Sequence, residues 1–321
     1  MELAVLGTGK IVQEALPVLE ELGIRPRALL GTERSRARTE ELAARYQIPC
    51  RCFRYEQALE SGADTVYVAL PNHLHFQFAR EALLRGMHVL VEKPAVAALS
   101  QLRDLRQLAA RRRLVLAETM TVHHLPAFLS LREQVPRLGP LRLAELNFSQ
   151  YSSRYDAFLR GETAPAFDPA QGGGALMDLN VYNIHCAAAL FGRPRQVRYC
   201  PNLQRGVDTS GVLVLDYGGM TAVCAAAKDC QGSNRSFIQG ELGRLELWEP
   251  VSALTGWELS LRSGERERFE TAPRAHRMRY EFAAFRRMVD GPDLAWAEEL
   301  LALTEISTAV LEEARSQIPA R

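Results

Sequence analysis

The second half of the chain carries three ionisable side chains at a regular spacing. Asp178, Tyr182 and His185 are spaced i, i+4 and i+7, so they would share one face of a helix. Glycines on both sides of this stretch predict a helix over residues 175–190. Acid–base groups in a row on an otherwise apolar helix suit proton transfer, whereas a polar face turned to solvent would give the same pattern.

Lysine is rare in this chain, which makes its positions informative. Only Lys10, Lys93 and Lys228 occur among the 39 Lys and Arg residues. Arginine stays protonated in proteins, whereas the surroundings of a lysine can shift its pKa. A lysine in a chain that otherwise uses arginine therefore indicates a role for the ammonium group. Lys93 lies in the tripeptide Glu92-Lys93-Pro94 after an apolar strand pattern, where a solvated strand end is the alternative. Lys228 ends another strand pattern, which indicates a function without specifying it.

The first strand pattern, at residues 3–6, runs into a loop that contains glycine. Gly7 permits a tight turn, and Gly9 lets the backbone approach a pyrophosphate at the start of the next helix. Val12 stands where the dinucleotide-binding fingerprint usually has a third small residue. We predict a phosphate loop of six residues: Gly7, Thr8, Gly9, Lys10, Ile11 and Val12.

The end of the second strand pattern bears on which dinucleotide fits. Rossmann proteins usually place an acid here, about 20 residues after the loop, to bind the ribose. In one register Gly31 takes the place of the acid, and the residues that then meet the 2′-phosphate of NADP are Thr32, Arg34 and Arg36. In the other register Glu33 is the acid and the cofactor is NAD. Both registers remain open, and the arginines favour NADP slightly.

Further residues follow the fourth and fifth strand patterns, at residues 65–70 and 89–91. Ligands of open α/β sheets bind beyond the carboxyl ends of the strands. The residues that map to this edge, in addition to the phosphate loop, are Leu70, Pro71, Asn72, His75, Glu92 and Lys93. We therefore predict that they line the cofactor site.

The fold class follows from the order of the patterns. Over the first 118 residues, short apolar runs alternate with helical patterns, which indicates a parallel sheet covered on both faces. Beyond residue 121, alternation predicts a largely antiparallel sheet with strands at residues 141–150, 211–217, 221–228, 244–248, 257–262 and 267–270. We predict an α/β chain with a doubly wound Rossmann domain at 1–120. A substrate-binding and oligomerisation domain, with a largely antiparallel open sheet, is predicted at 121–321.

The composition narrows the class of protein. The formal net charge is +1, which argues against a nucleic-acid or anionic-membrane partner. No apolar run reaches the roughly 18–20 residues that span a bilayer. The six cysteines form no C-x-x-C pair, and no set of residues has metal-ligand spacing. Reduced thiols, a cytoplasmic location and the absence of a metal site are therefore expected.

Taken together, the motifs resemble those of the Gfo/Idh/MocA family of oxidoreductases. The segments that carry the resemblance are the loop at 7–12, the P-N-x-x-H turn at 71–75, the E-K-P tripeptide at 92–94 and G-G-G-A-L-M-D at 172–178. The resemblance implies hydride transfer between NAD(P) and a carbohydrate, cyclitol or related polyol. It also implies that Lys93, Asp178 and Tyr182 meet at the reacting carbon.

Two residues compete for the acid–base role. Many relatives have histidine where this chain has Tyr182, but a nearby ammonium favours the ionised phenol, so Lys93 would make Tyr182 a workable acid–base. His185 is the rival, because an unperturbed imidazole already titrates near neutral pH. If Tyr182 is the acid–base, His185 is expected to bind substrate. Tyr151 and Arg154 leave a strand before the glycines and are expected to bind substrate, with a surface loop as the alternative.

The expected reaction is a reversible alcohol oxidation of a small polyol or sugar. The hydroxyl proton passes to Tyr182 or His185, Lys93 stabilises the oxygen, and Asp178 orients a neighbouring group. A homodimer or homotetramer through the C-terminal sheet is expected. The alternatives are a redox-neutral enzyme with tightly bound NAD, and a non-enzymatic nucleotide-sensing regulatory protein. His123 and His124, after the sixth strand, are expected to be structural.

Overall fold

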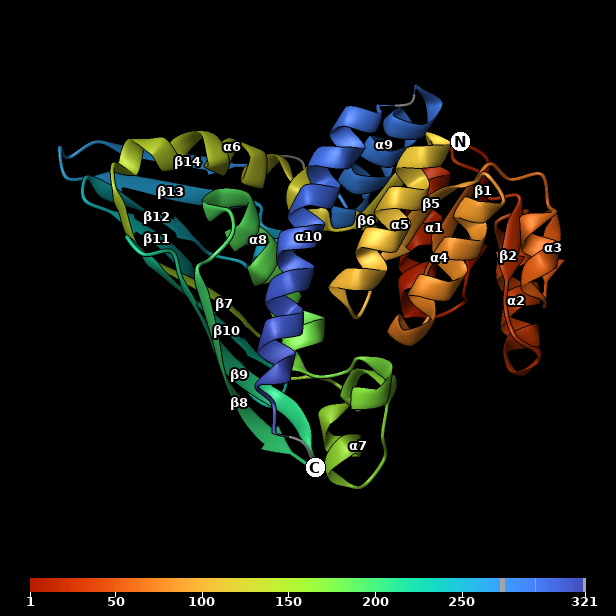
Figure 1. Cartoon of the computed structure of the whole chain (residues 1–321), viewed down its shortest axis with the longest axis horizontal. Helices are drawn as coiled ribbons and strands as arrows, with labels where there is room; N and C mark the ends of the chain where they lie inside the picture. The colour runs from red at the N-terminus through yellow and green to blue at the C-terminus, as the bar shows by residue number, and fades with distance from the viewer. Residues whose placement is uncertain (272–274, 292, 320–321) are drawn as a thin grey trace. The chain divides into compact units, whose positions relative to one another are not determined.

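The computed structural model describes residues 1–271, 275–291 and 293–319 (Figure 1). The chain divides into two compact units. Unit 1 comprises Met1–Thr119 and His276–Glu305, and unit 2 comprises Met120–Ala275 and Ile306–Arg321. Each unit has a sheet of its own.

Unit 1 contains a six-stranded parallel sheet in the order β3-β2-β1-β4-β5-β6. Its strands are β1 (Leu3–Leu6), β2 (Ala28–Leu30), β3 (Cys50–Cys52), β4 (Thr65–Val68), β5 (His88–Glu92) and β6 (Leu116–Thr119). The order reverses between β1 and β4, which lie side by side, and this switch point is where open α/β sheets bind ligands. The predicted doubly wound parallel sheet is confirmed.

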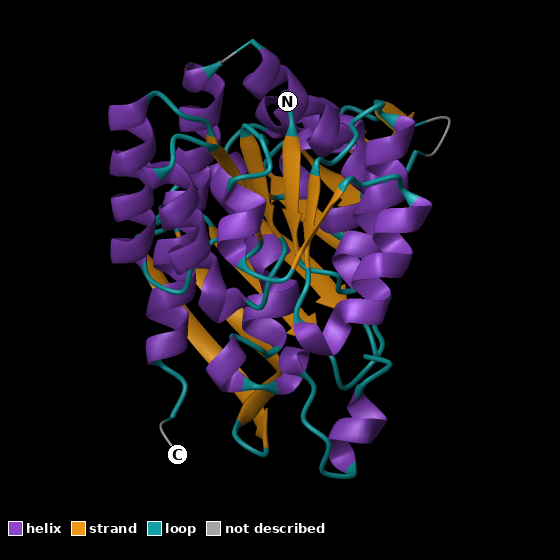
Figure 2. Ribbon diagram, turned by 90° about the vertical axis from the view of Figure 1, so that its right-hand side faces the viewer, coloured by secondary structure: helices purple, strands orange, loops and turns teal. Residues whose placement is uncertain are grey.

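Helices cover both faces of this sheet, because the inner strands are buried on both sides. The helices of unit 1 are α1 (Lys10–Glu21), α2 (Arg36–Arg45), α3 (Tyr55–Leu59), α4 (His75–Leu84), α5 (Leu99–Arg112), α9 (Arg277–Asp290) and the first part of α10 (Leu294–Ser316). One core joins α1, α2 and α9 to the sheet, and the other joins α4 and α5 to it. Figure 2 shows helices on both sides of the strands that lie below the N-terminus.

The helix α9 belongs to unit 1 although it comes late in the sequence. Its apolar residues Phe282, Phe285 and Met288 are fully buried in the same core as Tyr67 of β4. The rings of Tyr67 and Phe282 meet edge to face at 5.3 Å. The division at residue 120 drawn from the sequence assigns α9 to the second domain, whereas these contacts place it with the first.

Unit 2 contains an eight-stranded sheet in the order β14-β13-β12-β11-β7-β10-β9-β8. Its strands are β7 (Leu141–Ser149), β8 (Gln196–Gln204), β9 (Val207–Asp216), β10 (Thr221–Ala227), β11 (Ser236–Gly240), β12 (Gly243–Leu247), β13 (Gly256–Leu261) and β14 (Arg266–Glu270). In the described part of the chain β7 and β10 pair in parallel and the other neighbours are antiparallel, so the predicted largely antiparallel sheet is confirmed.

Two strands of unit 2 have no counterpart in the sequence prediction. β8 is mostly exposed and contains Pro201, so it lacks a clear alternation, and β11 is only five residues long. The helices of this unit are α6 (Pro126–Gln134), α7 (Tyr155–Leu159), α8 (Val181–Phe191) and the last part of α10. Among the helices described, none is both long and apolar enough to cross a membrane.

Candidate active site

The phosphate loop follows directly from β1. Gly7 has φ +119°, and a Cβ there would lie 2.4 Å from the carbonyl oxygen of Ala69, so only glycine fits. Gly9 is the N-cap of α1 and brings no side chain to the helix end. Backbone N–H groups at such an end suit a phosphate. Val12 is fully buried beneath the loop, so a branched residue fits at the third fingerprint position.

The ends of β4 and β5 are tied together by His75. Its ring nitrogens lie 2.7 Å from the carbonyl oxygen of Leu70 and 3.0 Å from that of Pro94. Burial lowers the pKa of His75. The side chain therefore acts as a brace between the turn at residues 70–72 and the Glu92-Lys93-Pro94 turn.

Glu92 is a buried carboxylate and not a solvated strand end. The hydroxyl of Tyr67 donates to its Oε1 at 2.5 Å, and the backbone N–H of Lys93 donates to Oε2 at 3.3 Å. Burial, followed by the charge of Glu92, raises the pKa of Tyr67 well above its usual range, which keeps the phenol a donor. This pair fixes the backbone from which the half-buried Lys93 extends.

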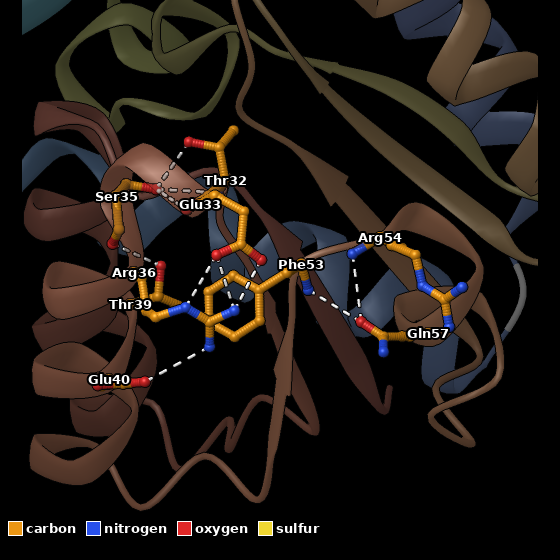
Figure 3. A network of polar contacts seen from close by, with 9 residues as sticks. All are labelled: Thr32, Glu33, Ser35, Arg36, Thr39, Glu40, Phe53, Arg54 and Gln57. Atoms are coloured by element: carbon orange, nitrogen blue, oxygen red, sulfur yellow. Dashed lines mark hydrogen bonds and ion pairs between the residues drawn. The ribbon is translucent and has the colours of Figure 1, made fainter.

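The turn after β2 carries the residues of both registers that the sequence left open. A Cβ at Gly31 would lie 2.0 Å from Oγ1 of Thr39, so an acid does not fit directly after the strand. Thr32 begins a short 3₁₀ turn in which its N–H donates to Oγ of Ser35 at 2.9 Å. Glu33 lies in this turn, and its carboxylate points to Arg36 (Figure 3).

Arg36 is exposed and contacts two neighbouring side chains. Its guanidinium makes bidentate hydrogen bonds of 2.6–2.9 Å to the carboxylate of Glu33. It also lies 3.8 Å from the ring centroid of Phe53 (Figure 3). The two charged side chains remain 46% and 71% exposed, so this pair is weakly held and open to exchange.

The glycines at 172–174 permit close packing at the start of the acid–base helix in unit 2. A Cβ on Gly173 would lie 2.5 Å from the carbonyl oxygen of Pro165, and one on Gly174 would lie 1.9 Å from Oδ1 of Asp208. Asp208 accepts hydrogen bonds from the N–H of Leu176 at 2.7 Å and the hydroxyl of Tyr199 at 2.8 Å. Burial raises the pKa of Asp208.

The predicted helix at 175–190 begins as a π-helical turn at Leu176–Asn180 and continues as α8. Asp178 lies in the π turn, and Tyr182 and His185 lie in α8. The three residues are therefore not on one regular α-helix as predicted. π turns inside helices recur at functional sites. Asn180 anchors this turn, since its side chain donates to the carbonyl oxygen of Cys224 in β10 at 3.0 Å.

Asp178 is paired with a lysine that the sequence could not place. Nζ of Lys228 lies 2.9 Å from its Oδ2. Lys228 follows β10, is 2% exposed, and also donates to the carbonyl oxygen of Ala166. Its ammonium lies 4.4 Å from the ring centroid of Phe167. The signal in the sequence was a lysine at a strand end in an arginine-rich chain, but its partner lies 50 residues away.

Tyr182 and His185 lie in different surroundings. Tyr182 is 8% exposed, and its ring lies 5.9 Å from that of Phe148. His185 is 1% exposed, and its Nδ1 lies 3.0 Å from Nε2 of His123. Burial, with the neighbouring His185, lowers the pKa of His123 well below its usual range.

The hydrogen bonding of His123 indicates its own tautomer. Nδ1 of His123 is buried and has no hydrogen-bond partner within the described residues. A buried N–H without an acceptor is rare, so this nitrogen is best left unprotonated. Nε2 of His123 then donates to Nδ1 of His185.

The remaining predicted substrate residues lie in and beside α7. Tyr151 is 42% exposed, and its hydroxyl donates to Oδ1 of Asp156 at 2.6 Å. Arg154 is exposed and is the N-cap of α7. Tyr155, which the sequence did not single out, is buried against Phe167 instead. Contact of Tyr151 and Arg154 with substrate stays a prediction.

Fold and site together define a dinucleotide-binding oxidoreductase built from two units. Residues 1–120 match the oxidoreductase family with an NAD-binding Rossmann fold, GFO_IDH_MocA, and residues 131–246 match the GFO/IDH/MocA C-terminal domain. The chain belongs to the Gfo/Idh/MocA family, as the sequence motifs predicted. The predictions of an enzyme of the oxidoreductase class and of an NAD(P) cofactor are likewise confirmed.

Several known proteins are similar over nearly the whole chain. An uncharacterized oxidoreductase of Escherichia coli (strain K12), YgjR, is 32% identical, with 99% of this chain and 96% of the relative covered. The scyllo-inositol 2-dehydrogenase (NADP(+)) IolU of Bacillus subtilis (strain 168) is 32% identical, covering 89% and 87%. The crystal structure of KijD10, a 3-ketoreductase from Actinomadura kijaniata in complex with NADP and TDP-benzene, has a TM-score of 0.82 and 25% identity, covering 97% and 96%.

Proposed function

We propose that this protein is an NADP-preferring oxidoreductase that transfers a hydride between the cofactor and a CH–OH carbon of a cyclitol, sugar or related polyol. The observation that carries the proposal is that each unit has its own acid–base residues: Lys93 after β5 in unit 1, and Asp178 and Tyr182 on the π turn and α8 of unit 2. The similarity to an NADP-dependent scyllo-inositol dehydrogenase supports the substrate class.

The turn after β2 supports the preference for NADP. Gly31 leaves no space for the acid that would bind the ribose hydroxyls of NAD. We assign the 2′-phosphate to Thr32, Arg34 and Arg36, of which Arg34 is exposed. Because the pair between Glu33 and Arg36 is exposed, a phosphate dianion would compete well with the carboxylate for the guanidinium.

The other predicted cofactor residues have simple tasks in this proposal. The phosphate loop offers backbone N–H groups from Gly7, Thr8, Gly9, Lys10, Ile11 and Val12. Leu70, Pro71 and Asn72 would lie against the cofactor at the edge of the sheet. His75 would act indirectly, by joining the turn at residues 70–72 to the turn at residues 92–94. Glu92 would hold the backbone of Lys93 in place.

In the proposed chemistry the bound nicotinamide supplies the hydride acceptor or donor at its C4 atom. Tyr182 takes the proton of the substrate hydroxyl during oxidation and returns it during reduction. Lys93 stabilises the negative charge that develops on the substrate oxygen. Asp178 accepts a hydrogen bond from a second hydroxyl, while His185 supports the substrate side of α8. Tyr151 and Arg154 are kept as substrate contacts.

The setting of the enzyme is part of the proposal. We assign it to the cytoplasm as a homodimer or homotetramer that associates through the sheet of unit 2. All six cysteines are free thiols, which fits a reducing compartment. Light scattering coupled to gel filtration would measure the oligomeric state, and a monomer at micromolar concentration would contradict association.

Turnover measured with NADP and NAD against a panel of cyclitols and sugars, beginning with scyllo-inositol, tests the reaction. We expect stoichiometric reduction of NADP with at least one polyol. Conversion of the polyol without net reduction of the cofactor would favour the redox-neutral alternative. Nucleotide binding without any turnover would favour the sensor.

The variant Lys93→Arg tests the chemistry. It keeps the positive charge but loses the tunable ammonium, so turnover should fall by roughly 10²–10⁴-fold while the Kd for NADPH changes little. Lys10→Arg is the matched control, since the same change in the phosphate loop should alter cofactor affinity and not kcat. Turnover of Lys93→Arg close to wild type would remove Lys93 from the mechanism.

A further inference from the structure

Lys228 is the most deeply buried of the three lysines, and its surroundings are specific. Its side chain is 3% exposed, whereas that of Lys10 is 81% exposed. The ammonium meets the Asp178 carboxylate and the Ala166 carbonyl oxygen, with the face of the Phe167 ring 4.4 Å away. Phe167 is fully buried, so bulk water does not stabilise this charge from that side.

A buried ammonium needs a compensating charge, because removing an ion from water costs several kcal/mol. Asp178 supplies this charge at 2.9 Å. The same ammonium also acts on Asp208, which anchors the neighbouring Leu176 N–H. Lys228 therefore fixes the orientation of Asp178, at the π turn that opens the acid–base helix.

The Asp178 side chain is asymmetric in its exposure. It is 37% exposed, although the lysine that holds it is almost completely buried. An ionised carboxylate accepts several hydrogen bonds and donates none. A carboxylate that is held from the protein interior and is still partly exposed suits recognition of a hydroxyl donor.

We propose that Lys228 is a positioning residue that holds Asp178 as an ionised acceptor for a second substrate hydroxyl, next to the reacting carbon. This inference rests on the proposed function and sharpens its substrate class, because the preferred substrate is then a vicinal diol. A site built to bind a hydroxyl discriminates against an analogue that lacks it, since the carboxylate then loses that hydrogen bond.

The first experiment needs no substrate. The Tm of wild type, Asp178→Asn, Lys228→Met and the double variant forms a double-mutant cycle. Asp178→Asn leaves a buried ammonium without its counter-charge and should lower Tm by about 5 °C. The double variant removes both charges and should recover part of that loss. Additive Tm changes would show that the two charges are uncoupled and would overturn the proposal.

The second experiment compares trans-cyclohexane-1,2-diol with cyclohexanol, each with NADP. Wild type should prefer the diol by roughly 10²-fold or more in kcat/KM. Lys228→Met should lower kcat/KM for the diol by about 10–100-fold and change that for cyclohexanol by less than about threefold. The acidic limb of its kcat/KM profile with the diol should also shift to higher pH, because the ammonium no longer favours the ionised carboxylate.

Asn183→Ala is the matched control for a purely structural effect. Asn183 anchors the same helix to the carbonyl oxygen of Ala225 at 3.1 Å and carries no charge. It should lower Tm without changing the preference for the diol or the pH profile. Equal losses on both alcohols in Lys228→Met would overturn the proposal. Wild type inactive on every polyol would contradict the proposed function, and the Tm cycle would still decide the coupling.

Discussion

The two units use the same kind of ion pair in different ways. In unit 1, Glu33 and Arg36 are bonded at 2.6 Å with side chains 71% and 46% exposed. In unit 2, Asp178 and Lys228 are 2.9 Å apart with side chains 37% and 3% exposed. Water screens the first pair, so it contributes little and can open to accept a different anion. The second pair cannot exchange without leaving a charge buried.

This difference separates two roles that the residue types alone do not distinguish. An exposed pair suits recognition of an exchangeable cofactor phosphate, whereas a buried pair suits a group whose geometry must stay constant during the reaction. The same contrast applies to the histidine pair of unit 2, in which His123 holds His185 away from solvent. If the contrast is correct, variants of buried groups should affect turnover most and variants of exposed groups should affect cofactor choice.

The largest effect is expected for Tyr182→Phe. The change keeps the ring and its packing against Phe148 but removes the proposed acid–base hydroxyl, so kcat should fall by roughly 10²–10⁴-fold. His185→Asn should mainly raise KM, because we assign His185 to substrate contacts and not to the proton transfer. Steady-state kcat and KM over a range of pH would measure both variants.

The opposite result would reverse the assignment. If Tyr182→Phe keeps most of its activity while His185→Asn loses activity together with the acidic limb of the kcat/KM profile, then His185 is the acid–base. The contrast between a reactive phenol and a supporting histidine pair would then be wrong.

The sequence predicted the site of unit 1 far better than that of unit 2, for a physical reason. The phosphate loop and the Glu92-Lys93-Pro94 turn are short, contiguous segments at strand ends, so residue order is enough to place them. The contacts that define the site in unit 2 join residues 50 positions apart for Asp178 with Lys228, and 62 apart for His123 with His185. Such partners follow from the register of β10 and the packing of α8, which periodicity does not give.

Some misses in the fold have equally specific causes. The strand β8 is exposed along most of its length, so its residues do not alternate by hydrophobicity. The π turn at Leu176–Asn180 has the same apolar composition as an α-helix, and its hydrogen-bond pattern is not visible in the sequence. The close contact between Gly31 and Thr39, which bears on the cofactor, required coordinates.

A smaller effect, confined to cofactor choice, is expected in the turn after β2. Arg34→Ala should weaken NADP binding by about 10–50-fold and leave NAD binding nearly unchanged, because one charge-assisted bond to the 2′-phosphate is lost. Glu33→Ala should change NADP binding by less than about threefold, or tighten it, since the competing carboxylate of an exposed pair is removed. Fluorescence titration with NADPH and NADH would give the four Kd values.

Either of two outcomes would contradict this assignment of the 2′-phosphate site. Weaker NAD binding in Glu33→Ala, with NADP unaffected by Arg34→Ala, would mean that Glu33 meets the ribose. Equal and small changes for both cofactors in both variants would show that this turn does not discriminate.

The smallest effect concerns pH and the buried histidines of unit 2. Burial lowers the pKa of His124 to about 4, below the unfolded value near 6.5. The unfolded chain therefore binds more protons below pH 6.5, so the stability that this group contributes is present above that pH and is lost as pH falls toward 4. The pKa of His123 is lowered in the same direction, whereas the buried Glu281 of unit 1 has a raised pKa and the opposite dependence.

His124→Gln isolates one of these groups. Wild type should lose about 3 °C more in Tm than the variant between pH 7 and pH 5, because the variant has no proton to take up on unfolding.

Glu281→Gln is the control of opposite sign. Because the folded form of Glu281 keeps its proton, the stability that this group contributes is lost as pH rises above 4.5. The Tm of the variant should therefore rise relative to that of wild type toward pH 8. Parallel Tm curves for wild type and His124→Gln would mean that His124 is not held as a neutral, buried imidazole. The contrast between fixed groups in unit 2 and exchangeable ones in unit 1 would then rest on the Asp178–Lys228 pair alone.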